Sequence, residues 1–327
     1  MKLLVLSEAD VHLLLTPAEC IRVMDEALQD LARGDAFQPL RSLLRPSGAK
    51  GFLGLMPAYR GGERPAFALK EVCVFPGNPV IGLDTHLGAV LLHSAHTGEL
   101  LAVMNASAIT ASRTAAVTAV ATRSLARPDA RVLAIVGTGV QARAHLHAVS
   151  LVRRFSEVRI AGRRTGQAAK FVERLAGSIT NARACSSVEE AVRGADVVVT
   201  VTSSGTPIVK REWIADGAHL NLVGSSVRTA REVDGATMAA GPIFVDRHES
   251  TVNESGDYLF AVEEGLIGPE NIRAELGDVL IGKAEGRRDD SEITIFKSLG
   301  LALEDLAAAD YLFRKAKAAG AGVWVEF

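Results

Sequence analysis

Two different patterns of apolar and polar positions divide the chain. Residues 7–34 carry apolar side chains at helical spacing, with a first start signal at Ser7, a second at Thr16-Pro17 and a stop at Gly34, which predicts helix over that range. Residues 40–104 carry shorter, alternating segments, and 88–95 and 100–104 flank a tight turn as the strands of a hairpin. The first third of the chain is therefore expected to form an antiparallel α+β unit.

From residue 131 onward, short apolar runs alternate with helical segments. The expected strands are 131–136, 158–161, 182–185, 196–202, 218–223 and 243–246, and the expected helices are 140–154, 165–176 and 187–193. Continuous apolar runs such as Val197-Val198-Val199 are typical of parallel strands that are buried on both faces. A helix rich in small residues is expected over 105–125, and a pair of helices over 293–319. The fold class is α/β, with a parallel sheet covered on both faces.

Composition and charge exclude some classes of function. The 36 basic residues are balanced by 38 acidic ones, so the chain has no excess positive charge for binding nucleic acid or an anionic membrane surface. No segment approaches the roughly 18 uninterrupted apolar residues of a membrane span. Glu8 and Asp10 occupy positions where a secretion signal would need apolar residues, so we expect a soluble, cytoplasmic protein.

Metal and disulfide chemistry are also disfavoured. The three cysteines, at positions 20, 73 and 185, are far apart and form no C-x-x-C pair. The close histidine pairs flank a hairpin turn (93 and 96) or stand at non-facing spacing on a helix (145 and 147). We therefore expect no metal site.

A glycine-rich turn follows the first strand of the alternating half and opens a helix. Its pattern is G-x-G-x-x-A, formed by Gly137, Thr138, Gly139, Val140, Gln141 and Ala142. Gly137 allows the tight turn, Gly139 lets the backbone approach a pyrophosphate, and Ala142 allows close packing of the helix on the strand. The unpaired N–H groups at the start of the helix favour an anion. Because the motif lies between a strand and a helix, it predicts binding of a dinucleotide cofactor.

Two arginines bear on the choice of cofactor. Arg163 and Arg164 follow the second strand, about where a site that prefers NAD keeps an acidic residue for the ribose 2′-hydroxyl. Guanidinium groups there can hold a 2′-phosphate through charge-assisted hydrogen bonds. We therefore expect NADPH to be preferred, while use of NADH stays open. The alternative is that both arginines are solvated loop residues.

Two further cations stand in unusual surroundings. Arg113 lies on the apolar face of the helix over 105–125, where an unpaired buried charge would cost several kcal/mol. It must therefore meet a ligand carboxylate, a cofactor phosphate or the acidic partner of a buried salt bridge. Lys70 opens an alternating strand, where a partly buried lysine can donate a proton or bind a carboxylate, and an exposed lysine is the alternative. Arg41 and Thr85 carry no signal of their own.

Short motifs follow one another in a characteristic order along nearly the whole chain. They are Arg41-Ser42, Gly54–Tyr59, Leu69–Val72, Phe75–Asn78, Gly82–His86, Ala108–Ala116, Val136–Ala142, Glu275–Val279 and Phe296–Gly300. The ordered set resembles the ornithine cyclodeaminase/mu-crystallin family, and it is far more specific than any single motif. The resemblance implies a Rossmann-type parallel-sheet domain, residues 120–304, inserted into an α+β dimerisation and substrate domain, residues 1–119 and 305–327. It also implies a homodimer.

The resemblance also assigns residues to roles. It implies that Lys70 and Arg113, together with Arg41, hold the substrate carboxylate and supply or relay a proton, and that Thr85 lies near the substrate. The positions matching those that line the nicotinamide cofactor are Thr114, Thr202, Ser203, Val223 and Ser298.

Two departures from the family pattern bear on the substrate. True ornithine cyclodeaminases carry an aspartate where this chain has Ser226, and a glutamate where it has Gly54. A cationic diamine would therefore lose both acidic partners. The chain in this respect resembles the ketimine reductases and Δ1-pyrroline-2-carboxylate reductases of the family, with Ser226 as a residue near the substrate.

These resemblances imply an NAD(P)H-dependent imine reductase. Its substrate would be a small cyclic ketimine carboxylate, Δ1-pyrroline-2-carboxylate or Δ1-piperideine-2-carboxylate, and its product the L-amino acid, proline or pipecolate. Three alternatives stay open: an oxidoreductase similar to alanine dehydrogenase, a cyclodeaminase that releases ammonia, and a protein that binds NADPH and a small ligand without catalysis.

Overall fold

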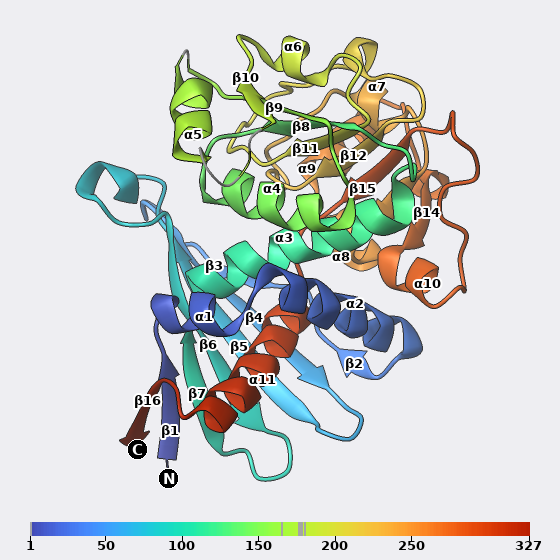
Figure 1. The fold of residues 1–327 in the computed structure, drawn as a ribbon. Coiled ribbons are helices and arrows are strands. Elements are labelled where there is room, and N and C mark those ends of the chain that lie inside the picture. Colours follow the sequence, from blue (N-terminus) through green and yellow to red (C-terminus); the bar gives the residue numbers. More distant parts are fainter. Residues whose placement is uncertain (1, 165, 176–178, 180) are drawn as a thin grey trace. The chain divides into compact units, whose positions relative to one another are not determined.

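The computed structural model describes residues 2–164, 166–175, 179 and 181–327 (Figure 1). Contacts between Cα atoms divide the chain into two compact units. Unit 1 comprises Met1–Arg113 and Leu301–Phe327, and unit 2 comprises Thr114–Gly300. The chain therefore enters unit 2 once and leaves it once, as it does where one domain is inserted into another.

Unit 1 begins with a strand and two helices. These are β1 (Lys2–Leu6), α1 (Glu8–Leu14) and α2 (Pro17–Arg33). The range expected to be helical, 7–34, holds two helices, and the second begins at the start signal Thr16-Pro17, where Thr16 caps a helix whose first residue is Pro17. Proline lacks the N–H group that a continuation of α1 would need. The second helix ends at Gly34, whose φ of 84° lies in the left-handed region.

The sheet of unit 1 is mixed. Besides β1 it contains β2 (Ala36–Phe37), β3 (Ser42–Leu44), β4 (Phe52–Arg60), β5 (Ala66–Val74), β6 (His86–Ser94), β7 (Leu100–Asn105) and β16 (Val323–Glu326), with the 3₁₀ turn η1 (Asn78–Ile81) before β6. The strand order is β16-β1-β7-β6-β5-β4-β2, and β3 pairs with β4. The expected hairpin of β6 and β7 is confirmed. The strands expected over 40–104 do pair antiparallel. The strand β1, which the pattern did not predict, pairs parallel with β7.

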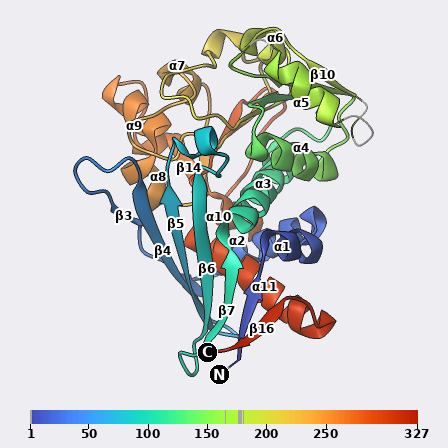
Figure 2. The same cartoon turned by 90° about the vertical axis from the view of Figure 1, so that its left-hand side faces the viewer.

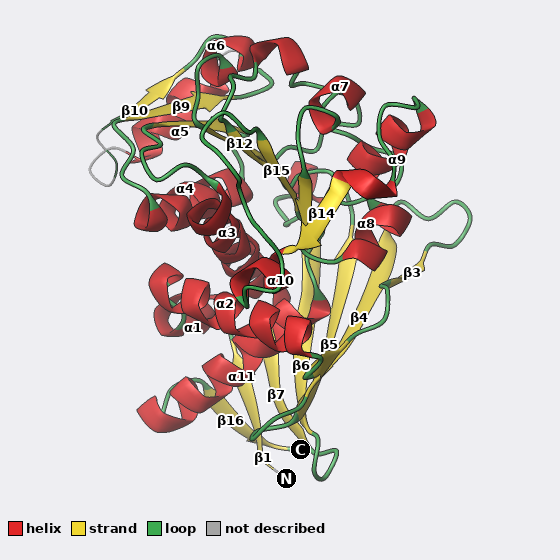
Figure 3. Ribbon diagram, turned by 90° about the vertical axis from the view of Figure 1, so that its right-hand side faces the viewer, coloured by secondary structure: helices red, strands yellow, loops and turns green. Residues whose placement is uncertain are grey.

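One face of this sheet is covered by α11 (Ala302–Ala319). The helix lies along β4, β5 and β6 and also packs against α2 (Figures 2 and 3). Along β5, Ala66, Ala68 and Lys70 are buried and alternate with more exposed residues, so these three side chains share one face of the strand. The pairing of β1 with β16 also brings the two ends of the chain together.

The pair of helices expected over 293–319 is wrong in its first half. Thr294–Lys297 forms strand β15 in the sheet of unit 2, and the helix of this range is α11. All four residues of β15 are buried, and a short apolar run of this kind fits a buried strand as well as a helix. Pairing with β12 and β13 on its two sides stabilises the strand.

Unit 2 is built on a parallel sheet. Its strands are β8 (Val132–Val136), β9 (Glu157–Ala161), β10 (Ala182–Ala184), β11 (Val197–Thr200), β12 (His219–Leu222), β13 (Ile243–Val245), β14 (Ile272–Glu275) and β15. Their order is β10-β9-β8-β11-β12-β15-β13-β14, and every pairing is parallel. The order reverses direction between β8 and β11, which is where doubly wound sheets bind their ligands.

Helices cover both faces of this sheet. They are α3 (Ala106–Leu125, which begins in unit 1), α4 (Val140–Val152), α5 (Gln167–Leu175), α6 (Val188–Val192), α7 (Gly235–Met238), α8 (His248–Glu254), α9 (Gly256–Glu263) and α10 (Leu276–Leu280), with the 3₁₀ turns η2 (Arg211–Trp213) and η3 (Pro269–Asn271). Ala134 and Val136 of β8 belong to one apolar core, whereas Leu133 and Ile135 belong to another. The predicted α/β fold class, with a Rossmann-type sheet and a second unit, is confirmed. Both ends of the expected helix 165–176 lie outside the described residues.

Across the part of the chain that the structure describes, no helix is both long enough and apolar enough to cross a bilayer.

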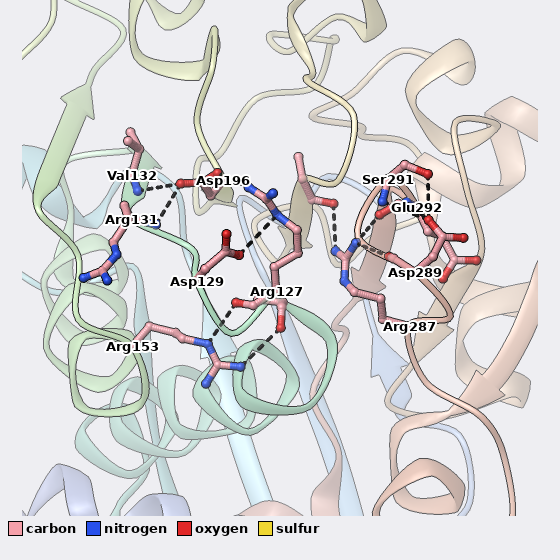
Figure 4. Close-up of polar contacts among 12 residues, drawn as sticks. Arg127, Asp129, Arg131, Val132, Arg153, Asp196, Arg287, Asp289, Ser291 and Glu292 are labelled. Atoms are coloured by element: carbon pink, nitrogen blue, oxygen red, sulfur yellow. Dashed lines mark hydrogen bonds and ion pairs between the residues drawn. The ribbon is translucent and has the colours of Figure 1, made fainter.

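Polar side chains secure the edge of unit 2 at which β8 begins (Figure 4). One oxygen of Asp196 accepts hydrogen bonds from the backbone N–H groups of Arg131 and Val132 at 2.8 and 2.9 Å. Its other oxygen lies 2.5 Å from Nη2 of Arg127. Arg153 donates to carbonyl groups at the end of α3, among them that of Arg127. The carboxylate therefore joins the start of β8 to the segment that enters it.

The replacement Asp196→Asn keeps the shape of this side chain but removes its charge. The amide can accept from the two backbone N–H groups, and its NH₂ group then faces the guanidinium of Arg127 as a second donor. We expect the free energy of unfolding, measured by urea titration, to fall by about 1–3 kcal/mol. An unchanged midpoint would show that the negative charge of Asp196 contributes nothing to the stability of this edge.

Candidate active site

A cluster of four buried charged side chains lies between the sheet of unit 1 and α11. Lys70 and Arg113 are each 4% exposed, and Glu304 and Asp305 are 1% and 0% exposed. Nζ of Lys70 lies 3.3 Å from both carboxylate oxygens of Asp305. Nε of Arg113 lies 3.1 Å from Oδ1 of Asp305, and its Nη1 lies 2.5 Å from Oε2 of Glu304. Asp305 is thus shared by the two cations.

The local sequence explains why these groups meet. Alternation along β5 turns Lys70 to the face that α11 covers, beside the small Ala68. Glu304 and Asp305 lie in the first turn of α11, where the helix dipole favours negative charge. The side chain of Gln38 accepts a hydrogen bond from the backbone N–H of Leu303 at 2.8 Å and so satisfies one donor of that turn.

The cluster changes the acid–base behaviour of its amine. Burial lowers the pKa of Lys70 to about 8; the charges of Arg113 and Arg41 act in the same direction, and Asp305 opposes them. Burial also disfavours the charge of Arg113, but Asp305 and Glu304 outweigh it and raise the pKa of Arg113 above its usual range. The cluster therefore combines a permanent cation with an amine that titrates near neutral pH.

The substrate residues expected from the sequence are found in different situations. The alternative of an exposed Lys70 is wrong, and Arg113 does form the buried salt bridge that was one of its alternatives. Arg41 precedes β3, half-buried, and its charge acts on Lys70. Thr85 precedes β6, and its carbonyl accepts from the N–H of Phe75 at 2.9 Å, a contact that places its backbone only.

Glu304 and Asp305 were missing from the predicted site. The signal for them was present: two adjacent acids stand between Leu303 and Leu306 in a helix that is otherwise rich in alanine and leucine. Acids on the buried side of a helix need partners, just as Arg113 does. The buried acids need cationic partners and Arg113 needs an acidic one, but only the fold shows that these residues, far apart in the sequence, meet.

In unit 2, the glycine-rich turn has the form that a pyrophosphate site needs. Gly137 has a φ of 139°, and a Cβ atom there would lie 2.8 Å from the carbonyl oxygen of Val201. Gly139 is the N-cap of α4, with open space where a side chain would be, and the first turn of α4 carries no acidic residue. Ala142 is fully buried in the core beneath β8. These residues therefore fit the phosphates of a dinucleotide.

The turn after β9 lies beside this glycine-rich turn. A Cβ atom at Gly162 would lie 3.0 Å from Cγ2 of Thr138. Arg163 and Arg164 follow Gly162 and are exposed. The backbone N–H of Arg164 donates to the side chain of Gln167 at 3.2 Å, which ties this turn to the start of α5.

The remaining predicted cofactor residues of unit 2, and the predicted substrate residue Ser226, follow its central strands. Thr202 and Ser203 come after β11, Val223 and Ser226 after β12, and Ser298 after β15. Since β11, β12 and β15 are parallel neighbours, these loops meet at the carboxyl edge of the sheet. Thr114 lies apart from them in sequence, buried on α3.

The histidines of the described residues do not form a metal site. His145 is fully buried, and burial lowers its pKa to about 4, so it is neutral. Its Nε2 lies 3.1 Å from Oγ1 of Thr118 on α3. Within ranges 2–164, 166–175, 179 and 181–327, no three acidic, histidine or cysteine side chains are grouped so that they could hold a metal ion.

A doubly wound parallel sheet with a glycine-rich first turn defines the class of dinucleotide-binding proteins. Within that class the chain belongs to the ornithine cyclodeaminase/mu-crystallin family, whose model matches residues 1–320. The resemblance found in the sequence is thereby confirmed.

Individual relatives are similar over most of their length. The chain is 40% identical over 293 residues to the ketimine reductase mu-crystallin of Mus musculus, covering 89% of this chain and 90% of the relative. The structure of the Δ1-pyrroline-2-carboxylate reductase of Thermococcus litoralis, in complex with NADH and L-proline, has a TM-score of 0.95 at 37% identity and covers 98% and 99% of the two chains. An archaeal alanine dehydrogenase dimer with bound NAD has a TM-score of 0.94 at 36% identity and covers both chains fully.

The replacement Lys70→Met tests the titration of the buried amine without any assay of activity. The ordinary pKa of lysine is 10.5, and that of Lys70 is about 8 in the folded chain. Between these values the unfolded chain binds more protons, so the amine makes the free energy of unfolding rise with pH. From pH 8 to pH 9.5, wild type should gain about 2 kcal/mol relative to Lys70→Met in urea unfolding.

Lys170→Met is the matched control, because Lys170 is exposed on α5. Its difference from wild type should stay constant over the same pH range. If Lys70→Met behaved in the same way, the amine of Lys70 would have an ordinary pKa and the electrostatic account of the cluster would be wrong.

Proposed function

We propose that this chain is a nicotinamide-dependent reductase of a small cyclic ketimine carboxylate, Δ1-pyrroline-2-carboxylate or Δ1-piperideine-2-carboxylate, with the L-amino acid as product. The observation that carries the proposal is the sharing of Oδ1 of Asp305 by Lys70 and Arg113, at 3.3 and 3.1 Å. It places an amine of tuned pKa beside a permanent cation. The mouse and Thermococcus litoralis relatives, a ketimine reductase and a Δ1-pyrroline-2-carboxylate reductase, support the same reaction class.

In this proposal the two cations have separate tasks. Arg113, oriented by Glu304 and Asp305, and Arg41 bind the substrate carboxylate. A carboxylate held in this way orients the adjacent C=N bond, which removes much of the entropic cost of the reaction. Thr85 and Ser226 complete the substrate contacts.

In this proposal Lys70 supplies the proton that the imine nitrogen of the substrate needs. With a pKa of about 8, roughly nine-tenths of its amine is protonated at pH 7. An ammonium at this position donates to the imine nitrogen, directly or through a water, and keeps the carbon electrophilic. Asp305 holds the ammonium in place and stabilises its charge.

Unit 2 would bind the cofactor, which supplies the hydride when bound. The backbone of Gly137–Ala142 would hold the pyrophosphate, and Arg163 and Arg164 a ribose 2′-phosphate, which favours NADPH over NADH. The residues proposed to line the nicotinamide end are Thr114, Thr202, Ser203, Val223 and Ser298.

We also propose that the chain forms a homodimer through the sheet of unit 1. On the face opposite α11, Val5, Phe67 and Leu87 are exposed, at 36%, 47% and 41%. Exposed apolar side chains on one face of a sheet favour association with a partner. The archaeal alanine dehydrogenase is itself described as a dimer.

Reduction of the open-chain imine formed from pyruvate and ammonia is the second candidate. The similarity to the archaeal alanine dehydrogenase favours it. Its substrate presents the same carboxylate and imine nitrogen to Arg113 and Lys70, so the charge cluster alone does not separate the two reactions. The two substrates differ in that only the cyclic imine carries a ring, so contacts with the apolar part of that ring would distinguish the two reactions.

The substrate is tested by following NADPH absorbance with Δ1-pyrroline-2-carboxylate, Δ1-piperideine-2-carboxylate, and pyruvate plus ammonia. We expect the highest kcat/KM with one of the cyclic imines, and a loss of about 10²–10⁴-fold in Lys70→Ala. Lys50→Ala, which changes an exposed lysine of unit 1, should match wild type. Inertness toward all three, with release of ammonia from ornithine in the presence of catalytic NAD, would refute the reductase. Tight NADPH binding without turnover of any substrate would favour a binding protein.

Cofactor preference is tested with the double replacement Arg163→Ala/Arg164→Ala. Loss of charge-assisted bonds to the 2′-phosphate should lower kcat/KM for NADPH by about 10–100-fold and leave that for NADH within about twofold. Arg174→Ala, an exposed arginine on α5, serves as the control for a simple change of surface charge. Equal efficiency of wild type with NADH and NADPH would contradict the preference.

A further inference from the structure

A second buried carboxylate, that of Glu232, lies in unit 2 at the carboxyl ends of β11 and β12. Its side chain is fully buried and receives three hydrogen bonds. Oε1 accepts from the backbone N–H of Thr202 at 2.6 Å. Oε2 accepts from the hydroxyl of Thr200 at 2.6 Å and from the backbone N–H of Gly224 at 2.8 Å. One carboxylate therefore joins the loop after β11 to the loop after β12.

The two loops approach each other closely around this carboxylate. A Cβ atom at Gly224 would lie 2.3 Å from the carbonyl oxygen of Thr202 and 2.5 Å from Oε1 of Glu232. No side chain fits there, so glycine is required at this position. The spacing between the loops is consequently fixed by Glu232 and by direct backbone contact.

A buried ion pair extends the connection to β15. The backbone N–H of Glu232 donates to Oδ1 of Asp257 at 2.7 Å. Oδ2 of Asp257 lies 2.9 Å from Nζ of Lys297, which also donates to the carbonyl of Ser225 at 2.6 Å. Lys297 is the last residue of β15 and directly precedes Ser298. The network thus ties together the ends of three neighbouring strands.

The buried charged groups of this network are better suited to fixing the geometry of the loops than to adding stability. Burial raises the pKa of Glu232, and its hydrogen bonds from Thr200 and Thr202 lower it, so the group bears a desolvation cost. Buried ionic groups often contribute less stability than apolar residues of the same volume. Their charge-assisted bonds are nevertheless short and directional, which suits a role in fixing geometry.

We propose that Glu232 is a positioning residue for the nicotinamide end of the cofactor site. It holds Thr202 and Val223, which stand on the two joined loops, in the arrangement that receives the nicotinamide. This inference rests on the proposed function, because those two residues line the nicotinamide only if the chain binds the cofactor as proposed above. Glu232 itself does not contact the cofactor in this proposal.

The proposal separates the two ends of the cofactor. The phosphates would be held by Gly137–Ala142, after β8, whereas Glu232 acts on the loops after β11 and β12. The fragment 2′-phospho-ADP-ribose keeps both riboses and the pyrophosphate but lacks the nicotinamide. It would therefore not need the arrangement of those loops. Loss of Glu232 should therefore weaken binding of NADPH but not of this fragment.

The experiment measures the Kd of NADPH and of 2′-phospho-ADP-ribose by calorimetry in Glu232→Gln. The amide places an NH₂ group against a donor, Thr202 N–H or Gly224 N–H. We expect the Kd of NADPH to rise about tenfold or more and that of the fragment to stay within about twofold. The same ratio should appear as a rise in KM for NADPH.

Two variants at Thr200 keep the test independent of whether Glu232→Gln folds. Thr200→Val removes the hydroxyl that donates to Oε2 of Glu232, at nearly constant volume, and should raise the Kd of NADPH about threefold. Thr200→Ser retains the hydroxyl and should restore the wild-type value. Asp196→Asn is the control for stability, since it weakens a carboxylate bridge at the opposite edge of the same sheet and should leave both Kd values unchanged.

The outcomes are distinct. Equal weakening of NADPH and the fragment, or a Kd for NADPH unchanged in both Glu232→Gln and Thr200→Val, would overturn the role of Glu232 while leaving the proposed function intact. Failure of wild type to bind either NADPH or NADH would overturn the proposed function and this inference with it. Selective loss of NADPH affinity, rescued by serine at position 200, would support both.

Discussion

The carboxylate of Asp305 is the constraint on which unit 1 depends. Two cations, Lys70 and Arg113, are taken out of water by the sheet and by α11, and each would be unfavourable there without an anion. Asp305 forms ion pairs with both cations, and Glu304 forms a second ion pair with Arg113. Residues from β5, α3 and α11 are thereby held at fixed distances. Packing of the unit and chemistry of its candidate site thus rest on the same interaction.

Much of the fold could be predicted because its signals are local. Alternating β and α segments and the glycine-rich turn of β8 reveal unit 2, and the hairpin of β6 and β7 follows from its turn. The elements that the sequence did not predict also have physical reasons. β15 is too short for its period to separate strand from helix, and its neighbours β12 and β13 stabilise the strand. The parallel pairing of β1 with β7 depends on a contact that no local pattern contains.

In the candidate site, too, features within one local segment could be predicted, whereas those that depend on distant contacts could not. The turn of Gly137 and the arginines after β9 could be located from spacing, since each lies within one βα unit. The environment of Lys70 could not, because its burial depends on α11, whose Asp305 lies 235 residues after Lys70 in the sequence. Glu232 carries no motif of its own, and only the fold shows that the ends of two strands direct three hydrogen-bond donors at its carboxylate.

The interrupted course of unit 1 has a consequence for the order of folding during synthesis. Arg113 leaves the ribosome 191 residues before Glu304, its acidic partner, and the whole of unit 2 is made in between. Domains fold as units while the chain emerges. Unit 2 can therefore complete its sheet while β1 to β7 still lack α11 and the strand β16. Leu301–Phe327 supply the helix, the two acids and the edge strand together, so unit 1 reaches its native state only after unit 2 has been made.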